Sequence, residues 1–505
     1  MALARVATIG LVGLKGNLIE VEVDISEGLP GYTLLGLPDT ALSESRERVR
    51  SALTNTGESW PNKKVTVSLS PAWLPKSGSS FDLTIAVALL QAQGILPVDD
   101  EAIFLGELSL GGDLRSIRGV LPALIAAQRL GFKRAILPVG NLHEARALRD
   151  LEVIGASHLG EVLRFMRTGE FPTPVSVSAH EARGSEALDL ADVAGQGAAK
   201  KALEISAIGG HHILFIGPPG TGKTMLAERI PSILPPLSDE DALEVAALQS
   251  INGTLQPGEI SHLAPFVAPH HGTTTVGMIG GGAHIVRPGS CSLAHHGILF
   301  IDEAPECGKG VLDSLRQPLE SGSVTITRSV GSITYPSQFI LVLAANPCPC
   351  GKFSGRGRSC TCSSLSIRRY LQKISGPLLD RIDLRIFVER PTRVEISDQE
   401  SGEPSSTIRN RVISARTLAA ERFTDEPWAL NSQIPASALR KKYRASKEAM
   451  AHLHGELDAE RLSARGFHKV LRTSWSIADS LGHNIPTLAD LQLALTMREA
   501  GEIFL

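Results

Sequence analysis

The apolar positions divide the chain into regions with different periodicities. Short apolar runs, such as residues 65–69 and 213–216, alternate with segments of helical spacing, such as residues 83–93 and 200–208. Runs of this length predict buried strands, whereas apolar residues three and four positions apart predict helices. After a polar stretch, helical spacing recurs with little strand character in residues 408–420, 447–457, 463–481 and 488–500. The pattern therefore predicts an α/β protein with a helical C-terminal region.

One predicted strand leads directly into a glycine-rich turn. Residues 213–216 are followed by Gly217, Pro218, Pro219, Gly220, Thr221, Gly222, Lys223 and Thr224, and residues 225–230 then have helical spacing. The spacing G-x-x-x-x-G-K-[ST] between a strand and a helix is typical of a loop whose N–H groups bind nucleotide phosphates. We expect Lys223 to contact the β- and γ-phosphates and Thr224 to bind Mg²⁺.

Two further apolar strands end in polar residues. Residues 298–301 are followed by Asp302 and Glu303, and residues 339–345 are followed by Asn346. Asp302 can hold the hydration shell of Mg²⁺, and Glu303 can orient and deprotonate an attacking water. The Asn346 amide can help to place the same water. We expect the three strand ends to meet at one γ-phosphate, although Asp302 and Glu303 taken alone also fit two surface acids.

Composition is that of a large globular enzyme with several domains. The 505 residues are 43% hydrophobic and 20% charged, with a net charge of −3 and a pI near 6.6. A nucleic-acid surface would therefore be a local patch. Residues 6–14 and 19–25 alternate like strands rather than forming a signal peptide, and no apolar run has the length of a membrane span. We expect a cytoplasmic protein without a membrane partner.

Four of the six cysteines lie in one segment just after Asn346. They are Cys348, Cys350, Cys360 and Cys362, whereas Cys291 and Cys307 are isolated. In a cytoplasmic protein, clustered thiols favour metal binding over disulfides, and two C-x-C pairs can form a tetrahedral zinc site. Zinc sites more often use C-x₂-C, so free or redox-sensitive thiols are the alternative.

The same segment is basic. Between Cys348 and Leu379 the chain has six basic residues and no acidic residue: Lys352, Arg356, Arg358, Arg368, Arg369 and Lys373. Such a patch suits contacts to nucleic-acid phosphates. A solvated basic loop is the alternative explanation.

The order of these motifs, continued by residues 378–383 and a helical region, resembles an AAA+ ATPase. Several longer sequence motifs resemble those of the ComM/YifB family of magnesium-chelatase-like AAA+ proteins. This resemblance covers nearly the whole chain. The segments that carry it include Ala268-Pro269-His270-His271, Arg287-Pro288-Gly289 and Asn346-Pro347-Cys348-Pro349-Cys350-Gly351.

This resemblance implies a domain organisation. It predicts a Lon-protease-like α/β domain at 1–168, a linker at 169–188, an AAA+ P-loop NTPase core at 189–395 and a helical lid domain at 396–505. Residues 74–83 and 106–112 are similar to Lon-type domains. Ser80 lies where a Lon serine nucleophile would be, but Leu121 occupies the place of its lysine partner. We therefore expect no peptidase activity.

The resemblance also assigns two arginines. Arg381 matches an arginine finger that would reach the γ-phosphate bound by a neighbouring subunit, which implies a ring and, by analogy, a hexamer. An ion pair with Asp380 or Asp383 is the alternative for Arg381. Arg465 lies in a segment similar to the second sensor motif, with Arg472 as a second choice.

Members of this family are regarded as ring helicases that drive branch migration during recombination and natural transformation. DNA is therefore the expected partner. Arg287, in a glycine-rich insertion at 270–287, and Arg328, in a hairpin predicted from residues 324–327 and 332–335, are candidate phosphate contacts. A chelatase-like motor and a protein remodeller are the competing functions.

Overall fold

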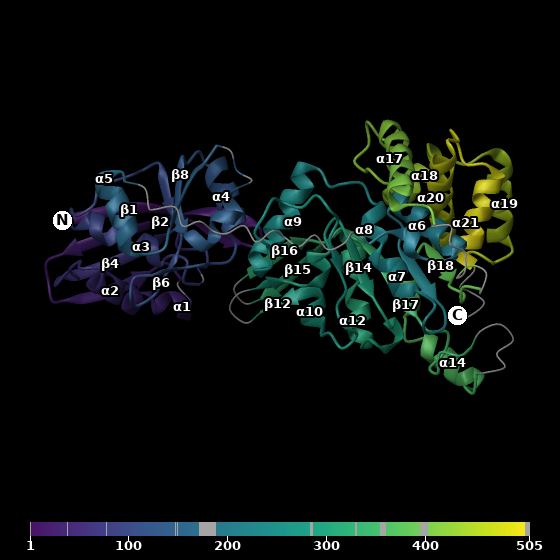
Figure 1. The fold of residues 1–505 in the computed structure, drawn as a ribbon, viewed down its shortest axis with the longest axis horizontal. Coiled ribbons are helices and arrows are strands. Elements are labelled where there is room, and N and C mark those ends of the chain that lie inside the picture. Colours follow the sequence, from purple (N-terminus) through teal and green to yellow (C-terminus); the bar gives the residue numbers. More distant parts are fainter. Residues whose placement is uncertain are drawn as a thin grey trace.

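The computed structural model of the protein describes residues 2–37, 39–76, 78–146, 148, 150–170, 188–282, 286–328, 331–353, 360–392, 395 and 402–499. In Figure 1 the N-terminal residues form one lobe, and the remaining residues form a second, larger lobe with the helical C-terminal region at its far end. Most of the linker expected at 169–188 lies outside the described residues.

The N-terminal lobe is built on a seven-stranded mixed sheet. Its strand order is β3-β4-β2-β1-β5-β8-β9. The long antiparallel pair β1 and β2 lies at its centre, so the strands predicted at 6–14 and 19–25 are confirmed. The strands are β1 (Ala2–Val12), β2 (Lys15–Ser26), β3 (Gly31–Leu35), β4 (Lys64–Ser70), β5 (Ala102–Phe104), β8 (Arg134–Pro138) and β9 (Glu152–Ala156), with β6 (Glu107–Leu108) and β7 (Leu114–Arg115) as a separate ribbon.

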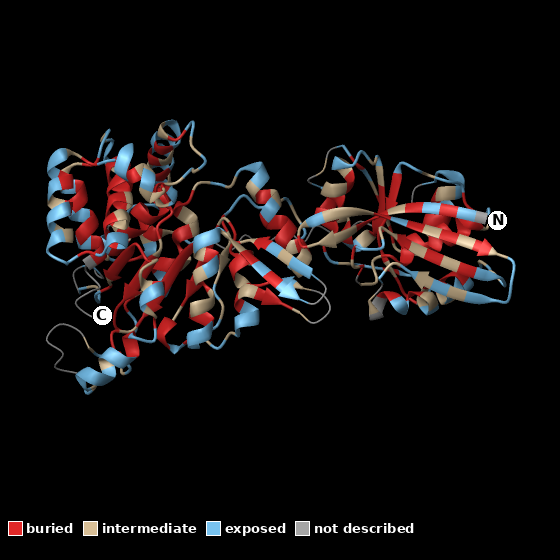
Figure 2. Cartoon of the chain, turned by 180° about the vertical axis from the view of Figure 1, so that it is seen from behind, coloured by how far each residue is buried: buried red, intermediate tan, exposed pale blue. Residues whose placement is uncertain are grey.

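Helices cover this sheet, and their burial follows the sequence pattern. The helices are α1 (Thr40–Ser43), α2 (Ser45–Asn55), α3 (Asp82–Ala92), α4 (Val120–Arg129) and α5 (Leu159–Thr168). Every residue of α3 is buried. On β2 the apolar residues Ile19, Val21 and Val23 are buried and alternate with more exposed neighbours, which Figure 2 shows as a change of colour along the strand. The alternation predicts this face because successive side chains on a strand point to opposite sides.

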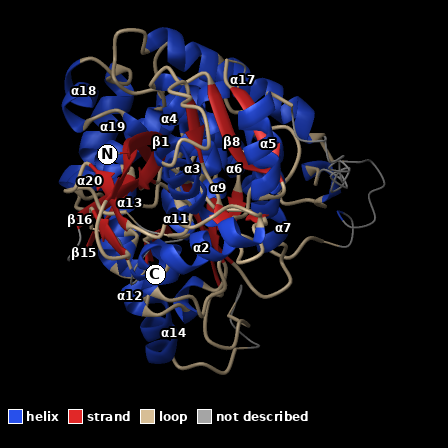
Figure 3. Cartoon of the chain, turned by 90° about the vertical axis from the view of Figure 1, so that its left-hand side faces the viewer, coloured by secondary structure: helices blue, strands red, loops and turns tan. Residues whose placement is uncertain are grey.

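The second lobe contains a five-stranded parallel sheet in the order β11-β14-β17-β10-β18. Its strands are β11 (Phe266–Val267), β14 (Ile298–Ile301), β17 (Ile340–Ala345), β10 (Ile213–Ile216) and β18 (Leu384–Phe387). All residues of β10, β14 and β17 are buried, and Figure 3 shows strands enclosed by helices. A parallel sheet covered on both faces gives continuous apolar runs, which is why these strands were predictable.

The helices around this sheet come from several parts of the chain. They are α6 (Gly197–Gly209), α7 (Lys223–Glu228), α8 (Ile230–Ile233), α9 (Asp239–Asn252), α10 (Thr275–Ile279), α11 (Ser290–Leu293), α12 (Lys309–Ser314), α13 (Arg316–Ser321), α14 (Ser364–Leu371) and α15 (Gly376–Leu379). Among the described residues of the segment expected as a glycine-rich insertion, α10 and the short strands β12 (Gly280–Gly281) and β13 (Arg287–Pro288) are ordered elements.

The C-terminal region is helical, as the sequence predicts. Its helices are α17 (Ser405–Arg422), α18 (Ala436–Lys441), α19 (Lys447–Asp458), α20 (Ala464–Leu481) and α21 (Leu488–Glu499). Arg416 of α17 donates hydrogen bonds to the carbonyl of Ala207 in α6, at 2.9 and 2.6 Å. His211, just after α6, lies 2.8 Å from Ser476 Oγ of α20. These contacts fix the helical region against α6, the first α-helix of the second lobe.

A hairpin of the second lobe contacts the N-terminal lobe. Strands β15 (Ser323–Arg328) and β16 (Gly331–Pro336) pair antiparallel, which confirms the predicted hairpin. The β1–β2 turn approaches it closely, because a Cβ added at Gly13 would lie 3.1 Å from Ile333 Cγ2. A second contact joins α4 to α9, where the Leu121 N–H and the Ser250 hydroxyl both donate to Glu144 Oε2, at 3.0 and 2.5 Å. None of the described helices is both long and apolar enough to cross a membrane.

Candidate active site

The carboxyl ends of three parallel strands meet at one edge of the second sheet. Strand β17 pairs with both β10 and β14, with Ile216 opposite Ala345 and Ile301 opposite Leu343. The segments that follow these strands are the phosphate loop, Asp302-Glu303 and Asn346. The three strand ends therefore lie next to one another, and their convergence on one γ-phosphate stays a prediction.

The phosphate loop depends on glycines at fixed places. Gly220 and Gly222 have positive φ angles of 75° and 88°, which side chains other than glycine rarely adopt. A Cβ at Gly217 would lie 2.3 Å from the carbonyl oxygen of Val388. The loop therefore turns tightly around the end of β10, and α7 begins at Lys223, so the loop leads directly into the first turn of that helix.

Lys223 lies inside this loop. Its Nζ donates to the carbonyl oxygens of Gly217 and Pro218, at 2.7 and 2.9 Å, and lies 3.4 Å from Asn346 Oδ1. Burial lowers the pKa of Lys223, and the nearby carboxylates of Asp302 and Glu303 oppose this effect. A buried ammonium group with three donors, beside a loop of main-chain N–H groups, fits the phosphates of a nucleotide.

Thr224 and Asp302 form the oxygen-rich part of the site. The Thr224 hydroxyl donates to Asp302 Oδ2 at 2.9 Å, and Asp302 Oδ1 accepts from the main-chain N–H of Glu303 at 2.8 Å. A hydroxyl and a carboxylate next to a phosphate loop are ligands that Mg²⁺ prefers, often through water. The residues present therefore fit a magnesium ion.

Glu303 has a strained backbone and a half-exposed side chain. Its φ and ψ angles are 49° and 43°, in the left-handed region, which costs about 1–2 kcal/mol for a residue with a Cβ. The carboxylate lies 3.5 Å from His271 Nδ1, and the rings of His270 and His271 are 4.0 Å apart. The motif resemblance included His271 but gave no reason to place it beside Glu303. Strain of this kind is concentrated at functional sites.

Arg381 lies near the amino ends of the parallel strands, whereas the phosphate loop lies at their carboxyl ends. Arg381 precedes β18, whose first residue Leu384 pairs with the first residue of β10, Ile213. A strand rises about 3.3 Å per residue, so the four residues of β10 separate the Arg381 segment from the phosphate loop by roughly 13 Å. Arg381 therefore lies on the side of the sheet away from the nucleotide site of its own chain.

The ion pairs around Arg381 differ from those expected. Arg381 pairs with Glu320 and also donates to the carbonyl of Pro377, at 2.6 Å. Asp380 instead pairs with Arg465 at 3.3 Å, and Asp383 pairs with Lys469 at 2.6 Å. The expected alternative of an Arg381 pair with Asp380 or Asp383 is wrong, because the C-terminal helices supply the partners of both acids.

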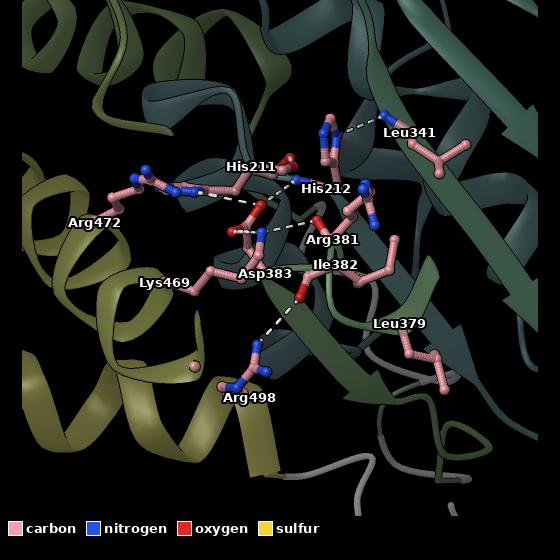
Figure 4. A network of polar contacts seen from close by, with 12 residues as sticks. His211, His212, Leu341, Leu379, Arg381, Ile382, Asp383, Lys469, Arg472 and Arg498 are labelled. Atoms are coloured by element: carbon pink, nitrogen blue, oxygen red, sulfur yellow. Dashed lines mark hydrogen bonds and ion pairs between the residues drawn. The ribbon is translucent and has the colours of Figure 1, made fainter. Parts of the chain in front are cut away.

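A polar network joins the Arg381 segment to the helical region (Figure 4). Lys469 donates to the Arg381 carbonyl at 2.8 Å, and Arg498 donates to the Ile382 carbonyl at 3.2 Å. Burial would raise the pKa of Asp383, but the Lys469 ammonium and the hydrogen bond with His211 hold it well below its usual range. Asp383 is thus a charged, buried anchor for the segment that carries Arg381.

A large cavity lies between the core and the helical region. Its volume is about 770 Å³, and its lining includes Arg381, Arg465 and Arg472. Arg465 is well exposed, whereas Arg472 is mostly buried and donates to the Ile434 carbonyl at 2.7 Å. The lining contains no residue of the phosphate loop. The structure therefore places Arg381 and Arg465 together, apart from Lys223.

Two of the candidate DNA-contacting residues lie side by side. Arg287 pairs with Gly281 in the β12–β13 ribbon, and Arg328 Nη2 would be 3.3 Å from a Cβ added at Gly281. Both arginines are exposed, and within the described part of the chain neither has an acidic partner. Lys352 is also exposed, whereas Arg356 and Arg358 lie outside the described residues.

The four clustered cysteines converge. Their sulfur atoms all lie within 4.8 Å of one another. Three of these separations are Cys348 to Cys350 at 3.4 Å, Cys348 to Cys360 at 3.7 Å and Cys350 to Cys360 at 3.7 Å. None of the four forms a disulfide, and the isolated Cys291 and Cys307 are buried elsewhere.

The geometry defines a class of protein. A phosphate loop, a strand ending in Asp-Glu, an adjacent strand ending in Asn, and a helical region after the last core strand together define an AAA+ ATPase. Three family models match the chain: "Magnesium chelatase, subunit ChlI" over residues 189–396, "Subunit ChlI of Mg-chelatase" over 21–141 and "Magnesium chelatase, subunit ChlI C-terminal" over 402–498.

Two similar proteins show to which family of AAA+ ATPases the chain belongs. The chain is 40% identical to the protein YifB of Escherichia coli, over 100% of this chain and 99% of that protein. It is 39% identical to the competence protein ComM of Haemophilus influenzae, over 95% and 94% of the two chains. The chain belongs to the ComM/YifB family of magnesium-chelatase-like AAA+ ATPases.

A third similarity concerns a smaller part of the chain. A Lon protease of Syntrophomonas wolfei is 31% identical over 160 residues, which are 29% of this chain and 20% of that protease. At the positions expected for a Lon serine and lysine, the structure has a partly buried Ser80 and a fully buried Leu121. The Leu121 N–H is bonded to Glu144, next to the contact with α9.

Proposed function

We propose that the protein is an ATP-driven ring motor that acts on DNA as a helicase and promotes branch migration in recombination and natural transformation. The observation that carries this proposal is the separation of two groups of residues. Lys223, Thr224 and Asp302 lie at the carboxyl ends of the parallel strands, and Arg381 lies near their amino ends. Such a chain needs a second copy to complete a nucleotide site.

In the proposed mechanism the phosphate loop, Gly217, Pro218, Pro219, Gly220, Thr221, Gly222, Lys223 and Thr224, binds the triphosphate of ATP. Lys223 would exchange its carbonyl partners for phosphate oxygens, and Thr224 and Asp302 would hold Mg²⁺, which would supply positive charge to neutralise the phosphates. Glu303 orients water and accepts its proton, and Asn346 positions that water. Half exposure of Glu303 leaves its carboxylate accessible to the solvent that supplies this water.

Arg381 and Arg465 would act on the nucleotide of a neighbouring subunit. Both line the same cavity, and the Lys469–Asp383 pair holds the segment that carries Arg381. A guanidinium group supplied in trans stabilises the charge of the transition state and couples hydrolysis to contact between subunits. A closed ring, by family analogy a hexamer, satisfies every such interface at once.

The DNA part of the proposal depends on exposed basic residues. Arg328 of the hairpin reaches Gly281, the strand partner of Arg287, and neither arginine has an acidic partner among the residues described. Lys352 provides a third exposed charge, and Arg356 and Arg358 belong to the same basic sequence. Phosphate contacts of this kind are indifferent to base sequence, as a translocating motor requires. The name of the H. influenzae relative links that protein to competence.

As cofactors we propose ATP with Mg²⁺ at the nucleotide site and Zn²⁺ at the cysteine cluster. For the N-terminal lobe we propose a Lon-like domain, residues 1–168, without peptidase activity. Leu121 lacks a basic group, so Ser80 would have no lysine partner there. The hairpin contact at Gly13 instead makes this lobe a support for the β15–β16 hairpin.

The test is the ATPase rate of the purified protein, alone and with single-stranded, forked and four-way-junction DNA. Glu303→Gln serves as the blank. The proposal predicts strong stimulation by branched DNA, together with strand-exchange products in the same reactions. A rate that no DNA changes would contradict the proposal and favour a chelatase-like or protein-remodelling ATPase.

A further inference from the structure

We propose that Cys348, Cys350, Cys360 and Cys362 bind one zinc ion, and that this zinc site positions Asn346 in the nucleotide site. The assignment of a role to Asn346 rests on the proposed ATPase function. The metal site itself follows from the geometry of the sulfur atoms.

The sulfur positions match those of a four-thiolate zinc centre. Zinc binds thiolates at about 2.3 Å with tetrahedral geometry, which places neighbouring sulfur atoms about 3.8 Å apart. The observed separations of 3.4, 3.7 and 3.7 Å approach that value. They exceed by far the roughly 2.05 Å bond of a disulfide. Four thiols this close to one another can surround a single zinc ion.

Main-chain N–H groups also point at the sulfur atoms. The N–H of Lys352 is hydrogen-bonded to Cys350, and the N–H of Cys362 is hydrogen-bonded to Cys360. Hydrogen bonds of this kind orient the ligands of a metal site and stabilise negative charge on thiolates. With four sulfur ligands the site has no open position, so it fits a structural zinc ion rather than a catalytic one.

A second cluster of side chains that could bind a metal is held together by hydrogen bonds instead. Glu244, His295 and His296 also group their polar atoms. However, His295 Nδ1 accepts a hydrogen bond from the Gln338 N–H at 3.1 Å, so in the neutral ring Nε2 carries the proton that it donates to Glu244, at 3.0 Å. Those groups satisfy one another as a hydrogen-bond network. Among the described residues, none of the four cysteine sulfur atoms has a carboxylate or imidazole partner.

The zinc ion would join two separate segments next to the nucleotide site. Cys348 and Cys350 follow Asn346 at the end of β17, and Cys360 and Cys362 precede α14. One ion bound to all four would therefore fix the start of α14 relative to the end of the strand that carries Asn346.

Two contacts connect this module to residues of the nucleotide site. Tyr370, on α14, lies beside the main chain of Asn346 and is only 4% exposed. Gly351 packs on the phosphate loop, because a Cβ there would lie 2.7 Å from Pro219. Asn346 itself lies 3.4 Å from Lys223 Nζ. The zinc-bound segment thus holds Asn346 and touches the loop that binds phosphate.

The first experiment measures metal in the full-length protein. Elemental analysis after gel filtration in metal-free buffer should give one zinc per chain, and Co²⁺ substitution should give the visible absorption of tetrahedral thiolate coordination. Cys350→Ser and Cys360→Ser should lose the metal, whereas Cys291→Ala, a buried cysteine outside the cluster, should keep it. Absence of zinc together with failure to take up Co²⁺ would overturn the metal site.

The second experiment separates positioning from folding. Tyr370→Phe should keep one zinc and its affinity for ATP but lower the kcat of ATP hydrolysis about fivefold, because the variant removes the polar hydroxyl beside the main chain of Asn346. Cys360→Ser should lower kcat further, with a smaller change in nucleotide affinity and an unchanged circular dichroism spectrum. If Cys360→Ser lost zinc but kept the parent kcat, the positioning role would be wrong.

Failure of this inference can be distinguished from failure of the proposed function. Glu303→Gln should abolish hydrolysis while retaining one zinc per chain, because Glu303 is not a ligand. A protein that bound zinc but hydrolysed no ATP under any condition would contradict the proposed ATPase and leave the metal site standing. A protein that hydrolysed ATP without binding zinc would contradict the metal site and leave the proposed ATPase standing.

Discussion

Acid should weaken the core of the ATPase lobe through one histidine, His212. Its Nδ1 accepts a hydrogen bond from the main-chain N–H of Leu341 in β17 at 3.1 Å, and the main-chain N–H of His212 donates to Asp383 Oδ2 at 3.0 Å. Close packing lowers the pKa of His212 to about 4, although the negative charge of Asp383 opposes this shift. A proton on Nδ1 would also face the Leu341 N–H. The folded protein therefore keeps this ring neutral.

The sign and size of the effect follow from linkage. In the unfolded chain a histidine has a pKa of about 6.5. Below that pH the histidine is therefore protonated in the unfolded state, whereas in the folded state it stays neutral until the pH approaches 4. Above pH 6.5 the neutral His212 makes its full contribution to the free energy of unfolding. That contribution falls as the pH drops from 6.5 toward 4. At pH 5 the loss is roughly 2 kcal/mol, about a 30-fold change in the unfolding equilibrium. Asp383 stays ionised over this range because its pKa is depressed.

Hydrogen exchange measures this change locally. After correction for intrinsic rates, peptides covering β17 should lose about 20-fold in protection between pH 7 and pH 5. His212→Asn supplies an amide oxygen where Nδ1 stood but does not titrate, so its loss should be much smaller. His295 and His468, whose pKa values burial also lowers, act equally in both proteins. An equal loss of protection in parent and variant would refute the reasoning.

Two further predictions concern the active site and the DNA surface, and the zinc experiments add a third. Glu303→Gln should bind ATP with parent affinity but hydrolyse it about 10²–10⁴-fold more slowly, measured by equilibrium binding and by phosphate release; a parent rate would remove Glu303 from its role. Arg328→Gln should weaken DNA binding uniformly across sequences and reduce the slope of log affinity against log salt by about 1, measured by fluorescence anisotropy. Arg5→Gln, which removes an exposed arginine of the N-terminal lobe, is its matched control and should leave that slope unchanged.

Much of the core could be predicted because its signals are local. The strands β10, β14 and β17 are buried on both faces, so each appears in the sequence as a continuous apolar run, and each is followed directly by its polar residues. Most of the C-terminal helices could also be predicted, from the helical spacing of their apolar residues. The short helix α18 was missed because six residues give too little periodicity.

What could not be predicted depends on contacts between distant segments. Arg381 pairs with Glu320, 61 positions away, instead of a neighbouring acid, because Lys469 and Arg465 from α20 take Asp383 and Asp380. The strained backbone of Glu303 and the position of Tyr370 beside Asn346 likewise have no sequence signature. The clustered cysteines were visible in the sequence, but only the fold reveals that their sulfur atoms lie close enough to surround one ion.

The central claim is that each nucleotide site is completed by a neighbouring subunit, and subunit mixing tests it most directly. Lys223→Ala removes the phosphate contact but keeps Arg381, and Arg381→Ala does the opposite, so each variant alone should have almost no ATPase activity. In rings assembled from equal amounts of both variants, about one interface in four pairs an intact Lys223 with an intact Arg381. We predict that the mixture recovers up to about a quarter of the parent ATPase rate. A mixture as inactive as the separate variants, or an active Arg381→Ala protein, would contradict the account.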